Sequence, residues 1–367
     1  LKFLAHGFAL FPLLGKPLKM PFATVNAAAP VQLFYELHPP AIEERGRVLL
    51  CMGFQSDGCN WKPQVDFLQA HGYTCVTFDN RGCGRSGQPR YRYTTQMMAR
   101  DALELVSVEL GWTLCETHLV AISMGGMIAL EMLASLAEGR FADIVSKEDR
   151  FLSASLLVTQ GVGWRNPQLG MPPLAYWRIM ASAVFPRGLS ARARMYRGLE
   201  QAFSREWLRA DSGQTHPQTG IPLTNGHVLA RRGAKLWYAK KAEGVSPTNS
   251  FAGYLGQVAA LATHSVAPAR LTRLAQQLNN ACPVLVVCAG RDNLVKYEAQ
   301  RSLACALLPA VTEMLDLPNG SHAVNEEHVD EFHSALLRVL FSASRWQARV
   351  VGVSDEGSTS TMPRSRL

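Results

Sequence analysis

The sequence predicts an α/β fold, in which helices cover both faces of a mostly parallel β-sheet, with a helical insertion. Short apolar runs typical of buried strands alternate with segments of helical spacing, which is the pattern of a parallel sheet. The alternation stops from 164 to 266, where helix-like runs rich in Trp, Arg, Pro and Gly indicate the insertion. The 367 residues, of which 47% are hydrophobic, suffice for one large domain with an insertion or for two small domains.

Each expected element has its own pattern in the sequence. An amphipathic strand is predicted at 31–38, and apolar runs predict buried strands at 47–54, 73–80, 117–122, 151–161, 282–290 and 312–318. Helical spacing of apolar residues predicts helices at 61–72, 94–111, 297–308 and 329–343, with another after Ser123. The helix at 94–111 begins with threonines and stops at Gly111.

These elements divide the chain into five segments. They are an N-terminal extension or targeting segment (1–20), a first part of the core (21–163), a helical cap (164–266), a second part of the core (267–343) and a flexible tail (344–367). Residues 1–19 are apolar with lysines and no acid, so the extension either carries an address or precedes a start at Met20. No apolar run reaches about 18 residues, so no transmembrane helix is predicted.

The charge is unevenly spread. The net charge is +8, but 13 Lys and Arg against 4 Asp and Glu lie between Arg165 and Glu243, so the cap is basic and the rest nearly neutral or acidic. Such a local surplus of positive charge indicates one basic surface rather than general binding of nucleic acids. The sequence has neither zinc-finger spacing nor an aromatic RNA-binding signature, so no nucleic-acid partner is predicted. The eight cysteines include no CxxC pair, which favours free thiols in a reducing compartment. His328 and His333 are five residues apart rather than four, so no metal site is predicted.

One serine follows a strand-like run and precedes a helix-like run. Ser123 has the small residues Ala121 and Gly125 two places to either side, as a very tight strand-to-helix turn requires. Such a turn exposes a nucleophilic hydroxyl at the carboxyl end of a strand, where parallel sheets bind ligands. A serine that merely caps a helix is the alternative, so the partners of Ser123 must decide.

Two partners follow where a parallel sheet would bring them. Asp292 comes just after the strand at 282–290, and His322 lies in the loop after the strand at 312–318. We expect His322 to accept the Ser123 proton and Asp292 to orient the imidazole. His328 lies inside the next helix and Asp316 lies within a strand, so these are weaker candidates.

An oxyanion hole needs two amide donors beside the serine. The residue after the nucleophile, Met124, supplies one. The loop after the strand at 47–54 supplies the other, and because Gly53 lets the chain turn there, Phe54 is the expected donor.

A second glycine motif has a different explanation. The stretch from Gly82 to Gly87 matches the dinucleotide pattern G-x-G-x-x-G and follows a strand. That motif requires a helix to open at once, whereas Pro89 follows here and no helical face begins before Thr94. We therefore predict a tight loop and no nucleotide cofactor.

Taken together, "FDNRGCGRSG" (78–87), "AISMGGMIALE" (121–131), "GRD" (290–292) and "GSHAV" (320–324) resemble the α/β-hydrolase fold serine hydrolases, in their esterase and haloperoxidase-like branch. The resemblance covers roughly 31–343 apart from the cap and the 139–150 loop. It implies an eight-stranded sheet, a helical cap, no cofactor and hydrolysis through a covalent acyl-enzyme. Ala121 departs from the usual first glycine of the turn, and Met52 stands where many members have histidine.

The expected function is a serine esterase or lipase-like hydrolase acting on a small-molecule or lipid ester. An acyl-CoA thioesterase is the enzymatic alternative, suggested by the basic cap, and a non-catalytic binding or scaffold protein is the alternative from another class. The terminal Ser365-Arg366-Leu367 resembles a peroxisomal address, which predicts an import receptor as partner and a peroxisome-type organelle as location. The cytoplasm and the mitochondrion remain the alternatives.

Overall fold

The computed structural model describes residues 21–351 except 147, 163–197, 247–248, 280 and 309. The expected extension (1–20), the first third of the cap and the end of the tail, with Ser365-Arg366-Leu367, lie outside the described residues. Among the described residues, no helix is long and apolar enough to cross a membrane.

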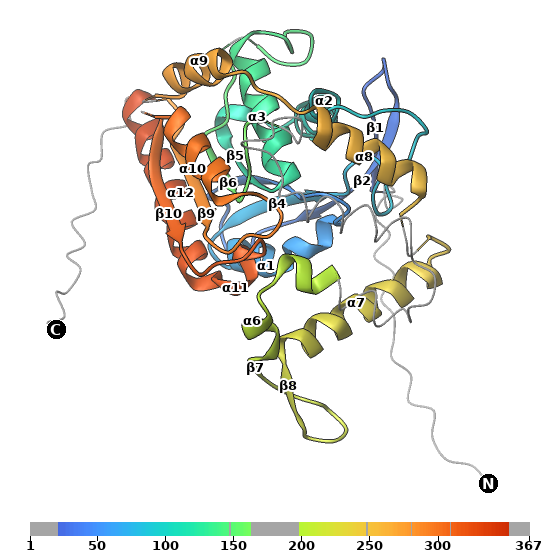
Figure 1. The fold of residues 1–367 in the computed structure, drawn as a ribbon. Helices are drawn as coiled ribbons and strands as arrows, with labels where there is room; N and C mark the ends of the chain where they lie inside the picture. The colour runs from blue at the N-terminus through green and yellow to red at the C-terminus, as the bar shows by residue number, and fades with distance from the viewer. Residues whose placement is uncertain are drawn as a thin grey trace, which may run out of the picture.

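Eight strands form the central sheet in the order β1-β2-β4-β3-β5-β6-β9-β10 (Figure 1). β1 pairs antiparallel with β2 and β2 antiparallel with β4, and every other neighbouring pair is parallel. The mostly parallel eight-stranded sheet is therefore confirmed, and β1 is a strand that the sequence did not reveal. The strands are Phe22–Val25 (β1), Val31–His38 (β2), Gly46–Cys51 (β3), Tyr73–Phe78 (β4), Thr117–Ile122 (β5), Ser153–Leu157 (β6), Val284–Ala289 (β9) and Val311–Leu317 (β10).

Helices cover both faces of this sheet, as predicted. One apolar layer joins the sheet to α2, α3, α9 and α10, and the other joins it to α1 and α12. Alternate residues of a strand serve the two layers, so Leu49 of β3 packs in the first and Leu50 in the second. The helices are Lys62–Ala70 (α1), Thr95–Glu104 (α2), Met124–Ala137 (α3), Pro268–Leu278 (α9), Tyr297–Ala306 (α10), Val324–Glu327 (α11) and Val329–Val351 (α12).

The described part of the cap segment is not helical throughout. It contains α6 (Arg205–Arg209), α7 (Asn225–Ala242) and α8 (Phe251–Thr263), but also an antiparallel hairpin of β7 (Asp211–Thr215) and β8 (Pro222–Thr224). Gly213 and Gly220 take positive φ values of 68° and 66°, which the hairpin needs and glycine permits. The expectation of a purely helical insertion missed this hairpin, because its polar residues lack the alternating apolar pattern of a half-buried strand.

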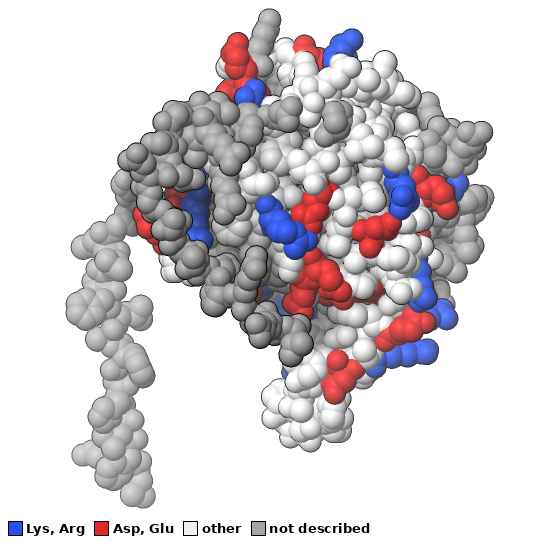
Figure 2. Space-filling model, turned by 90° about the vertical axis from the view of Figure 1, so that its left-hand side faces the viewer, with Lys and Arg blue, Asp and Glu red and all other residues white. Residues whose placement is uncertain are grey.

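Charges outside the cap are mixed rather than segregated. On the side of the molecule turned toward the viewer in Figure 2, acidic and basic side chains lie next to one another. The β10 edge provides an example, where Arg301 contacts Asp316 at 2.6 Å and Arg338 pairs with Glu313. This agrees with a sequence whose basic surplus is concentrated between Arg165 and Glu243.

A buried ion pair anchors the loop after β4 to α2. Arg81 and Asp101 are 0% and 2% exposed, and their closest atoms, Nε and Oδ2, are 2.5 Å apart. Replacing Arg81 with methionine should lower the free energy of unfolding by about 3–5 kcal/mol, because the Asp101 carboxylate would stay buried without its cation. Urea denaturation measures the change.

The matched control is the exposed pair of Lys62 and Asp66 on α1, whose charged atoms are 2.8 Å apart. Lys62→Met should change the free energy of unfolding by less than about 1 kcal/mol, because water already solvates both groups. If Arg81→Met and Lys62→Met changed the free energy of unfolding equally, the burial of the Arg81–Asp101 pair would make no difference to stability.

Candidate active site

Ser123 occupies a strained turn between β5 and α3. Its backbone has φ 56° and ψ −122°, a conformation that residues with a side chain rarely adopt. The close packing around it explains the small neighbours: a Cβ on Gly125 would overlap the backbone carbonyl of Cys51, and one on Gly126 would overlap Thr159. The tight strand-to-helix turn expected from the sequence is therefore present.

His322 and Asp292 meet beside this turn. Asp292 follows β9 and His322 follows β10, and the imidazole Nδ1 lies 2.8 Å from the carboxylate Oδ2. The Asp292 side chain is completely buried and that of His322 is 10% exposed. The amides of Leu294 and Val295 donate to the other carboxylate oxygen at 2.7 and 3.0 Å. With the backbone amides bound to one carboxylate oxygen, the other oxygen accepts from the imidazole, which therefore carries hydrogen on Nδ1.

Gln300 of α10 is a further partner of Asp292 that sequence reasoning missed. Its Nε2 donates to Asp292 Oδ2 at 3.0 Å, and its Oε1 accepts from the Ala289 amide at 2.8 Å. The side chain is fully buried, so it fixes the carboxylate against the end of β9. No sequence pattern predicts a glutamine in this role. Its position eight residues after Asp292, near the start of a predicted helix, is the one signal that could have suggested it.

The weaker candidates have other partners. Asp316 accepts hydrogen bonds from Tyr297 and Arg301 at the sheet edge. His328 lies 3.3 Å from Glu331 on the surface. Among the described residues, no hydrogen bond joins either of them to His322 or Asp292.

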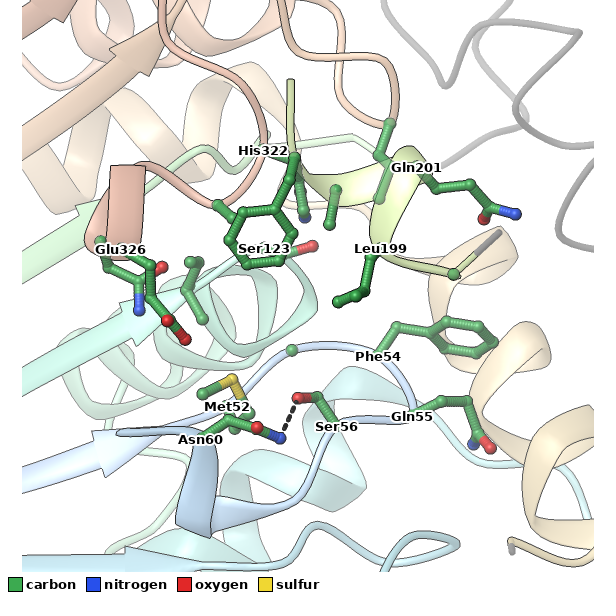
Figure 3. Close-up of a pocket in the computed structure, with 18 of the residues that line it drawn as sticks. Met52, Phe54, Gln55, Ser56, Asn60, Ser123, Leu199, Gln201, His322 and Glu326 are labelled. Carbon is green, nitrogen blue, oxygen red and sulfur yellow. Dashed lines mark hydrogen bonds between the residues drawn. The ribbon is translucent and has the colours of Figure 1, made fainter. Parts of the chain in front are cut away.

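Ser123 and His322 open into one cavity of about 630 Å³. Both side chains line it, and in the view of Figure 3 the Ser123 hydroxyl lies near the His322 ring. Its other lining side chains are mainly apolar, including Met127, Leu199, Phe203, Leu229, Leu236 and Leu261. A hydroxyl beside an imidazole that is itself bonded to a buried carboxylate can act as a nucleophile.

Of the two expected amide donors, Met124 directly follows Ser123 and Phe54 lines the same cavity. Met124 is the first residue of α3, so its amide has no carbonyl within its own helix to bind. Gly53 lies against the serine, since a Cβ there would be 3.1 Å from Ser123 Cβ, and Phe54 follows it in the cavity wall. Met52, the departure noted in the sequence, also lines the cavity (Figure 3).

Cysteines near the site do not compete with Ser123 as nucleophiles. Cys51 is buried under the turn, and burial raises the pKa of its thiol to about 12. Cys59 lies in a short 3-10 helix (Gly58–Trp61), and burial, followed by the nearby Asp57, raises the pKa of its thiol to about 12 as well. Both therefore stay protonated near neutral pH, and a thiol is a poor nucleophile.

The glycine motif at 82–87 forms a closed loop rather than a phosphate cradle. The buried Asp79 carboxylate accepts from the Arg85 amide at 2.8 Å, and the Ser86 hydroxyl donates to the Asp79 carbonyl at 2.5 Å. α2 begins only at Thr95, so no helix N-terminus follows the glycines as a dinucleotide site requires.

A family model described as "Alpha/beta hydrolase family" matches residues 48–335, which includes Ser123, Asp292 and His322. The chain belongs to this family. Among curated relatives of this alpha/beta hydrolase, a provisionally named carbamate hydrolase, RutD, of Agrobacterium fabrum is 26% identical over 316 residues, covering 85% of this chain and all of the relative.

Solved structures share its fold. The esterase EaEST of Exiguobacterium antarcticum has a TM-score of 0.60 at 17% identity, covering 86% of this chain and 97% of the esterase. An enol-lactonase of Burkholderia xenovorans has a TM-score of 0.59 at 20% identity, covering 88% and 100%. A bromoperoxidase of Bacillus anthracis has a TM-score of 0.60 at 21% identity, covering 87% and 99%. These structures confirm the predicted fold, and the family match confirms the predicted resemblance to the α/β-hydrolases.

Proposed function

We propose that this alpha/beta hydrolase cleaves carboxylic esters through an acyl-enzyme on Ser123. The observation that carries the proposal is the 2.8 Å contact between His322 Nδ1 and the buried Asp292, next to a serine held in a strained turn. The contact leaves Nε2 of His322 as the basic nitrogen on the side of Ser123.

In the first half of the reaction, Ser123 Oγ attacks the ester carbonyl carbon while His322 Nε2 takes the hydroxyl proton. The carbonyl π electrons move to oxygen, and the amides of Phe54 and Met124 stabilise the resulting anion. Collapse of this intermediate breaks the bond to the alcohol, which leaves with the proton from His322. Asp292 stabilises the imidazolium in the meantime without taking the proton itself.

In the second half, water attacks the acyl-enzyme with His322 again as the base. The bond between the acyl carbon and Ser123 Oγ breaks, the acid leaves, and the proton returns to the serine. The apolar cavity wall provides a binding surface for an acyl or alkyl chain of moderate length, since about 25 cal/mol is gained per Å² of apolar surface removed from water.

An acyl-CoA thioester and a carbamate are the other candidate substrates. Arg232 of α7 is a cationic residue in the cavity wall, but it already pairs with Glu326 of α11, which reduces the attraction for a negatively charged head group. A carbamate carbonyl would meet the same nucleophile, and a relative carries that name. Comparing kcat/KM on p-nitrophenyl esters of increasing chain length, acyl-CoA and aryl carbamates separates the three classes.

A fluorophosphonate probe tests the nucleophile directly. We expect one phosphonyl adduct per chain, found by mass spectrometry on the peptide that contains Ser123. An adduct elsewhere would assign the nucleophile to another residue, and an unmodified, folded protein would favour the non-catalytic alternative.

A further inference from the structure

The oxyanion loop Gly53–Phe54–Gln55 does not hold its shape by local structure alone. Gln55 has φ 54°, in the left-handed region that costs a residue with a side chain roughly 1 kcal/mol or more. Phe54, whose amide we place in the oxyanion hole, directly precedes it. Contacts from elsewhere must therefore hold Gln55, and through it the Phe54 amide, in place.

Gln257 of α8 provides the principal contacts. Its Oε1 accepts hydrogen bonds from the Gln55 backbone amide at 2.8 Å and from the Gln55 side chain at 2.9 Å. Its Nε2 donates to the carbonyl of Arg81 at 2.9 Å, which fixes the amide group in one orientation. The side chain is completely buried, so water does not compete for these bonds.

Two neighbours of Gln257 strengthen the same attachment. Asn249 Nδ2 donates to the side-chain oxygen of Gln55 at 2.9 Å, and its Oδ1 accepts from the Gly84 amide at 2.8 Å. The rings of Tyr254 of α8 and Phe54 pack in a T-shaped arrangement, with centroids 5.4 Å apart. The polar groups of Gln55 are thus bound by a segment, 249–257, that lies about 200 residues further along the chain.

We propose that Gln257 is a positioning residue for the oxyanion hole, which it acts on through Gln55. The inference rests on the proposed function, because it assumes that the Phe54 amide stabilises the anion. Preorganised donors must lie about 2.7–3.1 Å from the developing oxyanion, so a small shift of this loop weakens catalysis more than it weakens substrate binding.

The test compares Gln257→Met with the native enzyme on one p-nitrophenyl ester and on its thionoester, whose sulfur is a poor hydrogen-bond acceptor. Methionine fills similar space without an acceptor for Gln55. We expect kcat on the ester to fall about tenfold with KM changed less than twofold, and the ratio of ester to thionoester rates to fall with it. A second variant, Gln55→Gly, accepts the positive φ but loses the side-chain bonds, and should lower kcat several-fold.

The control is Glu243→Gln, which removes the ion pair between Glu243 and Arg85. This pair also connects the end of α7 to the core, and its charged atoms are 2.7 Å apart. This variant should keep native kcat, since no hydrogen bond or ion pair joins Glu243 to Gln55 or Phe54 in the described part of the chain. Native kcat in Gln257→Met, or equal losses on ester and thionoester, overturns the proposal; if Gln257→Met does not fold, Gln55→Gly decides it by the same criteria. Ser123→Ala, measured in parallel, separates this failure from failure of the proposed function, since only the latter leaves Ser123→Ala active.

Discussion

Replacing Ser123 with alanine is expected to lower kcat by about 10⁴-fold or more. The variant keeps the cavity and the amide donors but loses the oxygen proposed to form the acyl-enzyme, so only residual stabilisation by the proposed oxyanion hole and by binding should remain. Initial rates on the best ester of the panel measure the loss. Because alanine fits wherever serine does, the free energy of unfolding should not fall, and urea denaturation checks this.

A serine on the same helix provides the control. Ser135 of α3 is buried and donates to Glu131 at 3.0 Å, away from the cavity. Ser135→Ala should retain native kcat. Hydrolysis by Ser123→Ala at a rate within tenfold of the native enzyme would rule out Ser123 as the nucleophile.

Replacing Asp292 with asparagine should lower kcat by about 10³–10⁴-fold. The four bonds to this carboxylate all come from donors, namely two backbone amides, Gln300 and His322. An asparagine NH₂ group must face at least one of these donors, and when it faces His322 it favours hydrogen on the wrong ring nitrogen. The base then has no lone pair on the side of Ser123.

Asp316→Asn is the matched comparison, because Asp316 is bonded to Tyr297 and Arg301 rather than to the imidazole. It should leave kcat within about twofold of the native value, as expected for a change at a partly exposed edge. Comparable losses in the two variants would mean that Asp292 acts through stability alone, which thermal unfolding of both proteins would reveal.

Much of the fold and the candidate site follows from simple geometry in the sequence. Buried strands separated by helices require a parallel sheet, and a parallel sheet brings the carboxyl ends of its strands to one edge. Ser123, Asp292 and His322 each follow a strand, so these residues could be expected to lie close together in the fold although they are far apart in the sequence. The same reasoning separated Asp292, after β9, from Asp316, which lies within β10.

The supporting residues could not be predicted in this way. Gln300 and Gln257 each act through several hydrogen bonds to residues distant in the fold or outside their own helix, and glutamine occurs at many positions without such a role. β1 is four residues long and pairs only at the sheet edge, and the β7–β8 hairpin is largely exposed, so neither has a strong apolar signal. Tertiary contacts determine these features, and a linear pattern does not encode them locally.

The strained backbone at Ser123 lowers the stability of the protein, while the side chain it carries is the proposed nucleophile. Glycine would adopt the same φ and ψ without strain, so at this one position the thermodynamically preferred residue is one that cannot react. Laboratory selection for heat tolerance alone would consequently tend to discard the hydroxyl. Any thermostabilising campaign on this enzyme needs a screen for activity in every round.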